Sequence, residues 1–235
     1  MKMIRTLALL ALLPMHQPVM AAERGYATTD FSKIRVEGSY IVTVVTGKSG
    51  SARSTGSAKA LERVSIDVQN RTLVIKPQRF NWGSAAEGNP GPVTIRVTAH
   101  ELDTAILSGA GSLMIDKMRG ARVSVINTGS STLTVEKIEA DRIDVSNNGS
   151  GTVQLSGSAL TGQVAVNGSA SLNAPSLLVG DLILSAQTSG RVLLAARRSA
   201  KVTSAGAGTV EIGGKPACTV NSVGAGSVNC GGATR

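Results

Sequence analysis

Aromatic side chains are nearly absent from this sequence. The five aromatic residues all lie before residue 83; they are Tyr26, Phe31, Tyr40, Phe80 and Trp82. Large aromatic rings supply much of the core of an ordinary globular domain. From residue 83 onward the core must therefore consist of aliphatic side chains, which suit the narrow interior of a stacked structure.

Long hydrophobic runs are also missing, since none approaches the roughly 18 residues of a membrane helix. The run Leu7–Leu13 follows Lys2 and Arg5 and precedes the small or apolar residues Val19-Met20-Ala21, as in a secretory signal peptide. We therefore predict a signal peptide over residues 1–21 and a periplasmic or extracellular protein without a membrane span. No cysteine lies in this segment, so we expect no lipid anchor.

Histidine is as scarce, with His16 and His100 as the two examples. His16 would leave with the signal peptide, so His100 would stand alone in the mature chain. A single histidine cannot build a Ser-His-Asp triad or a histidine-based metal cluster. We interpret His100 as a structural or solvated residue, and we expect no catalytic residue, no metal site and no cofactor.

Charge is moderately basic but diffuse. Removal of the signal peptide leaves 22 of the 24 Lys and Arg residues against 15 Asp and Glu. The densest basic group, Arg191, Arg197, Arg198 and Lys201, is interpreted either as solvated surface or as an anion patch for an anionic envelope polymer. No basic run with interleaved aromatics points to nucleic acid.

A short glycine-rich pattern recurs seven times in the second half of the chain. Its closing apolar residues are 18 to 20 positions apart, at 113, 133, 153, 172, 192, 210 and 228. Such a repeat of turns and β-branched runs is typical of one coil of a β-solenoid. The copies begin at Ser108, Thr128, Asn148, Asn167, Gln187, Ala205 and Val223.

Three columns of the aligned repeats are apolar at all 21 positions. They are the closing residue, the residue two after it and the residue eight before it. Alternation with period two places these columns inside and the intervening polar residues in water. Two further columns hold mostly glycine, which we attribute to corners with positive φ. We expect changed corners where glycine is replaced, at Ser131, Ala170 and Thr188.

Residues 30–100 are β-rich but less regular. Alternating apolar residues predict strands over 33–36, 40–45, 64–68, 72–75 and 93–97, with a hairpin turn at Asn70-Arg71. Composition predicts loops over 47–57 and 81–92, the latter including Trp82 next to Phe80. These two aromatics either pack on the solenoid end or form an exposed recognition tip. We expect this region to cap the first coil, either as a separate cap or as additional coils.

The chain resembles the GIN domain family, a domain of unknown function also described as an auto-transporter adhesin head. The matching features are Phe31–Gly38 (FSKIRVEG), Leu73–Ile75 (LVI), Val93–Thr98 (VTIRVT), Glu101-Leu102 and the Ser-Gly-Ala-Gly repeats. The resemblance covers about residues 30–231 and implies a right-handed parallel β-helix. It brings no catalytic residues, and we expect this chain to depart from a true autotransporter in having no translocator.

Carboxylates and turn asparagines offer weaker candidates. The acidic residues of the repeats scatter among different columns, and the nearest pair, Asp141 and Asp144, is interpreted as a solvated strand edge. Asn148 and Asn167 match glycosylation acceptors, but they fall on the repeat turn. We favour turn chemistry there, with a stabilising ladder of polar side chains at 108, 128, 148, 167 and 187 rather than a ligand site.

The two cysteines, Cys218 and Cys230, both lie in the last repeat. Period-two alternation from Val220 and Val228 points both side chains inward, on facing walls of one coil. Export favours oxidation, so we predict a disulfide, with two buried free thiols as the alternative.

These observations divide the chain into a signal peptide (1–21), a β-rich N-terminal part and cap (22–100), a repeat solenoid of about seven coils (101–231) and a short tail (232–235). The function they indicate is that of an exported, non-enzymatic structural or adhesion module at the cell envelope. Its partner would be an anionic envelope polymer or another envelope protein. The alternative is a polysaccharide-binding or polysaccharide-degrading β-helix protein.

Overall fold

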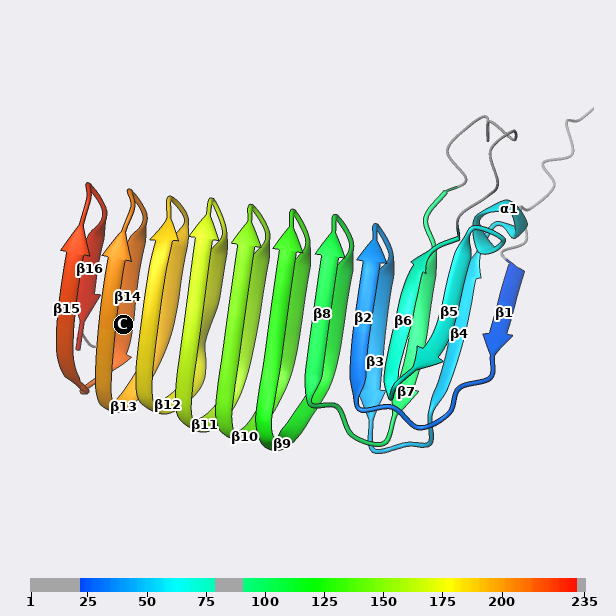
Figure 1. Ribbon diagram of the computed structural model, residues 1–235, viewed down its shortest axis with the longest axis horizontal. Helices are drawn as coiled ribbons and strands as arrows, with labels where there is room; N and C mark the ends of the chain where they lie inside the picture. The colour runs from blue at the N-terminus through cyan, green and yellow to red at the C-terminus, as the bar shows by residue number, and fades with distance from the viewer. Residues whose placement is uncertain (1–21, 79–90, 232–235) are drawn as a thin grey trace, which may run out of the picture.

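The computed structural model describes residues 22–78 and 91–231. It is almost entirely β-structure, with 76% strand and 2% helix, arranged as stacked parallel coils of a β-solenoid. In Figure 1 the chain rises along the front wall, turns, descends behind and advances towards the C-terminal end, which makes the coil right-handed. The predicted signal peptide, Phe80 and Trp82 lie outside the described residues.

Each central coil is one long strand that bends once and so runs along two facing walls. The β8 wall, at the front in Figure 1, contains β8 (Thr104–Gly109), β2 (Lys33–Gly38), β6 (Thr72–Pro77) and β15 (Ala217–Val223). The β3 wall behind it contains β3 (Ile41–Thr46), β7 (Thr94–Ala99), β14 (Thr209–Gly214) and β16 (Ser227–Cys230). The first half of each long strand lies in the β3 wall and the second half in the β8 wall. The long strands are β9 (Ser112–Gly129), β10 (Thr132–Gly149), β11 (Thr152–Gly168), β12 (Ser171–Thr188) and β13 (Arg191–Ala205).

The walls meet along two different edges. At one edge, which we call the glycine-corner edge, a sharp turn joins successive strands; at the other, the bend edge, each long strand curves without interruption. The pairing shifts register at the bend edge, for example between Val135 and Ile138. Coils of different length therefore differ at the bend edge, and the glycine corners stay aligned.

The two glycine columns serve different purposes. Gly149 has φ +112°, and an added Cβ would lie 2.6 Å from the Gly129 carbonyl oxygen of the preceding coil. Gly151 has no positive φ, so the expectation of positive φ was wrong for the second column. That position is small because a Cβ there would lie 2.5 Å from the Ser131 carbonyl oxygen.

The predicted changed corner at Thr188 is confirmed. Its side chain is buried, and its hydroxyl donates to the Ala170 carbonyl oxygen at 2.7 Å. In the next coil the backbone N–H of Gly208 donates to the Thr188 carbonyl oxygen. At an earlier corner the donor to the equivalent carbonyl is the residue directly after the first glycine. The next corner shows the same shift, with the Gly226 N–H donating to the Gly206 carbonyl although both glycines are present there. The shift therefore runs through the last two corners and is not explained by the missing glycine alone.

Residues 33–46 add a complete coil that the repeat alignment missed. Strand β2 (Lys33–Gly38) pairs in parallel with β8 (Thr104–Gly109), and β3 (Ile41–Thr46) pairs in parallel with β9. The corner between them contains Gly38, with φ +112°, but Tyr40 replaces the second glycine. This coil is continuous with the repeat stack although more than 50 residues separate it from β8 in sequence.

The N-terminal end continues both walls and then reverses strand direction. Strands β6 (Thr72–Pro77) and β7 (Thr94–Ala99) pair in parallel with β2 and β3. Antiparallel strands follow at the edge: β5 (Val64–Gln69) on β6, β4 (Ser51–Gly56) on β7, and β1 (Ala22–Tyr26) on β4. Helix α1 (Ala58–Leu61) joins β4 to β5.

The capping region tests several sequence predictions. The hairpin turn is confirmed, because Asn70 and Arg71 have φ 49° and 59° between β5 and β6. The predicted loop over 47–57 was wrong in its second half, where β4 forms. Its polar composition suits a strand at the end of the stack, because only alternate residues, Ala52 and Ser54, are buried.

The core follows the predicted columns. Eighteen of the 21 predicted interior residues are buried, and the exceptions, Val220, Val228 and Cys230, belong to the last coil. That coil consists of β14 (Thr209–Gly214), β15 (Ala217–Val223) and β16 (Ser227–Cys230), with β15 on β13 and β16 on β14. Within the described ranges no further coil covers it. In the structure Cys218 and Cys230 are joined by a disulfide across the two walls, with their Cα atoms 6.3 Å apart.

A buried polar column accompanies the apolar ones and was not anticipated. Asn127 and Asn147 are fully buried, one coil apart. The Asn127 Nδ2 donates to Asn147 Oδ1 at 3.0 Å, and Asn147 Nδ2 donates to the Ser171 carbonyl at 2.9 Å. Ser131, in place of a corner glycine, donates its hydroxyl to Asn127 Oδ1. Asparagine in this column therefore satisfies backbone groups of the glycine corners.

Candidate functional site

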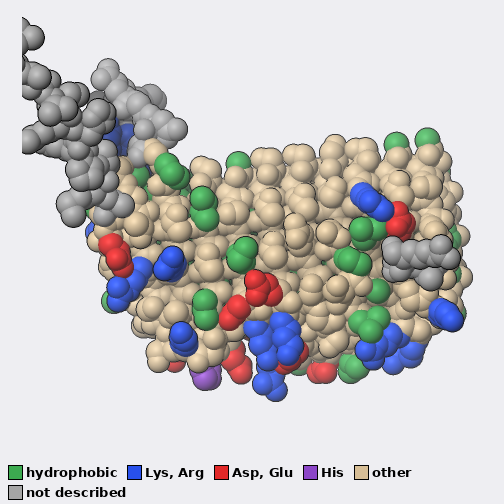
Figure 2. Space-filling model, turned by 180° about the vertical axis from the view of Figure 1, so that it is seen from behind, with side chains coloured by type: hydrophobic (Ala, Val, Ile, Leu, Met, Phe, Trp, Pro, Cys, Tyr) green, Lys and Arg blue, Asp and Glu red, His purple; other side chains and the backbone are tan. Residues whose placement is uncertain are grey.

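Charged side chains are unevenly distributed over the surface. Figure 2 shows Lys, Arg, Asp and Glu gathered mainly along the bend edge, whereas the glycine-corner edge is covered by small uncharged residues. The repeat explains this separation: close approach of successive corners demands small residues, whereas the bend tolerates long side chains. Most of the charge on the face shown in Figure 2 therefore lies along the bend edge.

Two carboxylates near the bend edge are held in the same way. Glu139 accepts from Lys137 of its own coil at 2.9 Å and from Lys117 of the preceding coil at 2.8 Å. Hydrogen bonds from Lys117 and Lys137 lower the pKa of Glu139 to about 2. One lysine, Lys137, lies two residues before Glu139 in the same coil. The other, Lys117, is stacked on Lys137 in the preceding coil.

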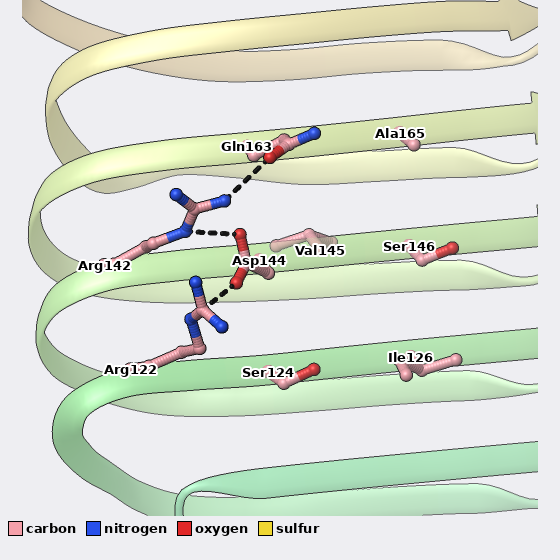
Figure 3. A pocket seen from close by; sticks show the side chains of 9 residues that line it. All are labelled: Arg122, Ser124, Ile126, Arg142, Asp144, Val145, Ser146, Gln163 and Ala165. Carbon is pink, nitrogen blue, oxygen red and sulfur yellow. Dashed lines mark hydrogen bonds and ion pairs between the residues drawn. The ribbon is translucent and has the colours of Figure 1, made fainter.

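Asp144 repeats this arrangement with arginines on the outer face of the β8 wall (Figure 3). Its Oδ1 lies 2.9 Å from Nε of Arg142, and its Oδ2 lies 3.2 Å from Nε of Arg122. Arg142 also donates through Nη2 to Oε1 of Gln163 at 2.8 Å. Four side chains from three successive coils thus form one network of ion pairs and hydrogen bonds.

A shallow hollow of about 390 Å³ lies beside this network. The parallel register stacks Ser124, Asp144 and Gln163 in one column. It stacks Ile126, Ser146 and Ala165 in the next column, so small side chains at 146 and 165 leave space beside the larger Ile126. The hollow therefore joins an apolar floor to a polar rim, which is the usual composition of a small-ligand site.

The rim presents donors and acceptors in alternation. Arg122 contacts Asp144 through Nε, which leaves its two Nη groups without a partner among the described residues. Gln163 accepts from Arg142, so its amide nitrogen stays available to donate. Asp144 supplies a carboxylate, which can accept further hydrogen bonds. Such a rim can bind a molecule that both donates and accepts.

The predicted basic group does not assemble at one place. Arg191 begins β13 next to the glycine-corner edge and forms an ion pair with Glu211 at 2.8 Å. Arg198 forms an ion pair with Asp181, which raises the pKa of Arg198 and lowers that of Asp181. Arg197 and Lys201 are exposed without an ion pair among the described residues.

The other predicted residues lie apart from the hollow, except for Asp144. His100 is exposed beside the start of the first bend, near Asp116. Asp141 is exposed at the bend edge and does not share the arginines of Asp144. In the predicted ladder, Asn167 Nδ2 donates to Asn148 Oδ1 at 2.7 Å, as turn chemistry requires. In the described part of the chain no group of three His, Cys, Asp or Glu could hold a metal ion.

The fold is a parallel β-solenoid that carries a shallow hollow with a polar rim on one wall. A family model described as "Putative auto-transporter adhesin, head GIN domain" matches residues 30–216, and the chain belongs to this family. A search of curated proteins finds no match. Within the described residues, no helix has the length and apolar character needed to cross a membrane.

Solved structures share the fold at low sequence identity. A "putative adhesin" from Bacteroides fragilis has a TM-score of 0.79 at 18% identity, with 89% of this chain and 96% of that chain covered. A "putative adhesin" from Parabacteroides distasonis has a TM-score of 0.67 at 20% identity, with 90% and 97% covered. A "putative lipid binding protein" from the same organism has a TM-score of 0.67 at 18% identity, with 89% and 96% covered.

Proposed function

We propose that this protein is an exported, non-enzymatic adhesion module that makes contacts at the cell envelope. The observation that carries the proposal is the outer face of the β8 wall, where a preorganised Arg–Asp–Gln network borders an apolar hollow on a rigid stack. The adhesin family and the adhesin-like structural neighbours support the same reading.

The arrangement of carboxylates supports a binding role over a catalytic one. Hydrolysis of a glycosidic bond needs two carboxyl groups that converge on the scissile bond. Asp144, the carboxylate of the hollow, is bridged on both oxygens by arginines, and the other carboxylate of the same design, Glu139, is held by two lysines. Arginine-held carboxylates are suited to fixed hydrogen bonding rather than to proton transfer.

Adhesion can be tested with the purified, exported protein attached to fluorescent beads. We expect these beads to be retained on bacterial cell surfaces or envelope fragments well above albumin-coated beads. Retention equal to albumin on every surface tested would contradict the proposal. Release of reducing ends from soluble polysaccharides by the same preparation would contradict its non-enzymatic part.

A further inference from the structure

The hollow beside Asp144 has the chemistry of a binding site for one or two sugar units. We propose that it binds an uncharged glycan through adjacent ring hydroxyls, with Arg122, Arg142, Asp144 and Gln163 as the polar contacts. This inference rests on the proposed function and names the class of ligand that the adhesion surface would take.

Hydrogen-bond capacity is the first argument. A pair of adjacent sugar hydroxyls donates and accepts at the same time, so it needs a carboxylate that accepts and neighbouring N–H groups that donate. Asp144 and the free Nη groups of Arg122 provide this combination on adjacent coils. Gln163, one coil further, adds an amide nitrogen to the rim.

Preorganisation is the second argument. Long side chains normally lose rotamer entropy when a ligand fixes them. Here the Arg142–Asp144 contact at 2.9 Å and the Arg142–Gln163 hydrogen bond at 2.8 Å already hold the rim in place. The network is also only half-buried, because the Asp144 side chain is 30% exposed and that of Arg142 is 43% exposed. It is therefore both ordered and accessible.

Shape and charge select the kind of ligand. Ile126 and Ala165 give the floor an apolar surface against which the C–H face of a sugar ring can pack, and Ile183, which is 56% exposed, follows Gln163 in its column. A ligand anion entering between the arginines would meet the Asp144 carboxylate. Two arginines face one carboxylate, so the rim keeps one excess positive charge. Neutral hydroxyl groups can pair with the Asp144 carboxylate and with the arginines alike, whereas an anion can pair with the arginines only, so we infer an uncharged glycan.

The volume of the hollow sets the affinity expected for a glycan. About 390 Å³ lies at the small end of ligand sites, and the hollow is shallow, so each protein molecule should bind weakly. Many copies on one surface would raise the avidity by roughly 10²–10⁴-fold without any new contact. Weak single-site binding to a repetitive polymer therefore fits an adhesion module.

The test uses the full exported protein and two sets of immobilised polysaccharides. Mannan and galactan serve as neutral probes, and polygalacturonate and heparin serve as acidic ones. We expect binding to at least one neutral probe that changes little between low and high salt, because no net charge is neutralised. Asp144→Ala and Gln163→Ala should each weaken that binding about tenfold, the loss expected for a missing hydrogen-bond partner.

Gln154→Ala is the matched control, because Gln154 is an exposed glutamine on the same strand β11 but in the β3 wall. It should bind as the wild type does, and all variants should melt with similar transitions. Three results would overturn the inference: no binding to either neutral probe, binding only to acidic probes with loss in high salt, or equal binding by wild type and both hollow variants. In each case bead retention on cells would show separately whether the adhesion proposal survives.

Discussion

Asn127 donates a hydrogen bond from Nδ2 to Oδ1 of Asn147, 3.0 Å away and one coil further along the solenoid. Both side chains are fully buried, and each also serves a backbone carbonyl at a glycine corner. Apolar columns alone tolerate a sliding of one coil on the next, whereas paired amides fix one register. This buried pair therefore links corner geometry to the register of the stack.

Asn147→Ala should destabilise the protein by about 1–3 kcal/mol, because it leaves the buried Asn127 amide and two corner carbonyls short of a partner. Asn173→Ala is the control, since Asn173 is exposed on the β3 wall. Thermal melts followed by circular dichroism measure both. Equal melting temperatures for the two variants would show that the amide ladder contributes nothing to stability.

Val145 and Asp144 are neighbours on β10 that face opposite sides of the wall. Val145 is 4% exposed, so Val145→Asp would place a carboxylate between coils and should cost several kcal/mol. Asp144→Ala removes two ion pairs whose arginine side chains are 66% and 43% exposed, so it should cost no more than about 1 kcal/mol. Urea unfolding compares them, and equal midpoints would refute the assigned register.

The architecture of the repeats could be predicted because two independent patterns agree on it. The glycine corners set the period, and the apolar columns set which side faces inward, as Leu133 and Val145 illustrate. The earliest coil escaped notice because Tyr40 replaces a corner glycine and because β2 and β3 enter the stack out of sequence order. Only a preserved Gly38 marked it, and one glycine is a weak signal.

The hollow could be predicted only in part. Alignment of the repeats would have stacked Asp144 on Gln163, because both lie in the regular part of the β8 wall. Arg122 and Arg142 are likewise 20 residues apart and stack in register, so the repeat would also have placed these two arginines together. It does not show that their side chains reach Asp144 and Gln163. The basic group failed to assemble for a different reason: the five residues between Arg191 and Arg197 cross the β3 wall and carry the two arginines to opposite edges.

Glu139 makes the stability of the folded protein depend on pH in the acidic range. Its pKa is lowered from 4.5 to about 2 by Lys117 and Lys137, so the folded state favours the charged form. Its stabilising contribution is therefore complete above pH 4.5 and is lost as the pH falls towards 2. Glu139→Gln should melt below the wild type at pH 7, and the gap should close as the pH falls through that window.

The control for this titration is Glu136→Gln, an exposed glutamate of the same coil without an ion pair among the described residues. It should melt close to the wild type throughout. High salt should also narrow the Glu139→Gln gap at pH 7, because the lysine contacts are solvent-exposed. A gap that stays constant from pH 7 to 2 would exclude these ion pairs as its cause.

The Cys218–Cys230 disulfide links the two walls of the last coil. The inward residues of β15 and β16 are not fully buried, with Val220 at 44%, because no described coil covers them. The disulfide closes a loop with a sequence separation of 12, worth about 3 kcal/mol in the chain-entropy model. Reduction, or replacement of both cysteines by serine, should therefore speed amide hydrogen exchange in β15 and β16. Strands β9 to β12, stacked on both sides, provide the internal control and should keep their protection.

Intact-mass measurement after alkylation in denaturant should show two labelled thiols only when reductant is added first, and labelling without reductant would disprove the bond in the exported protein.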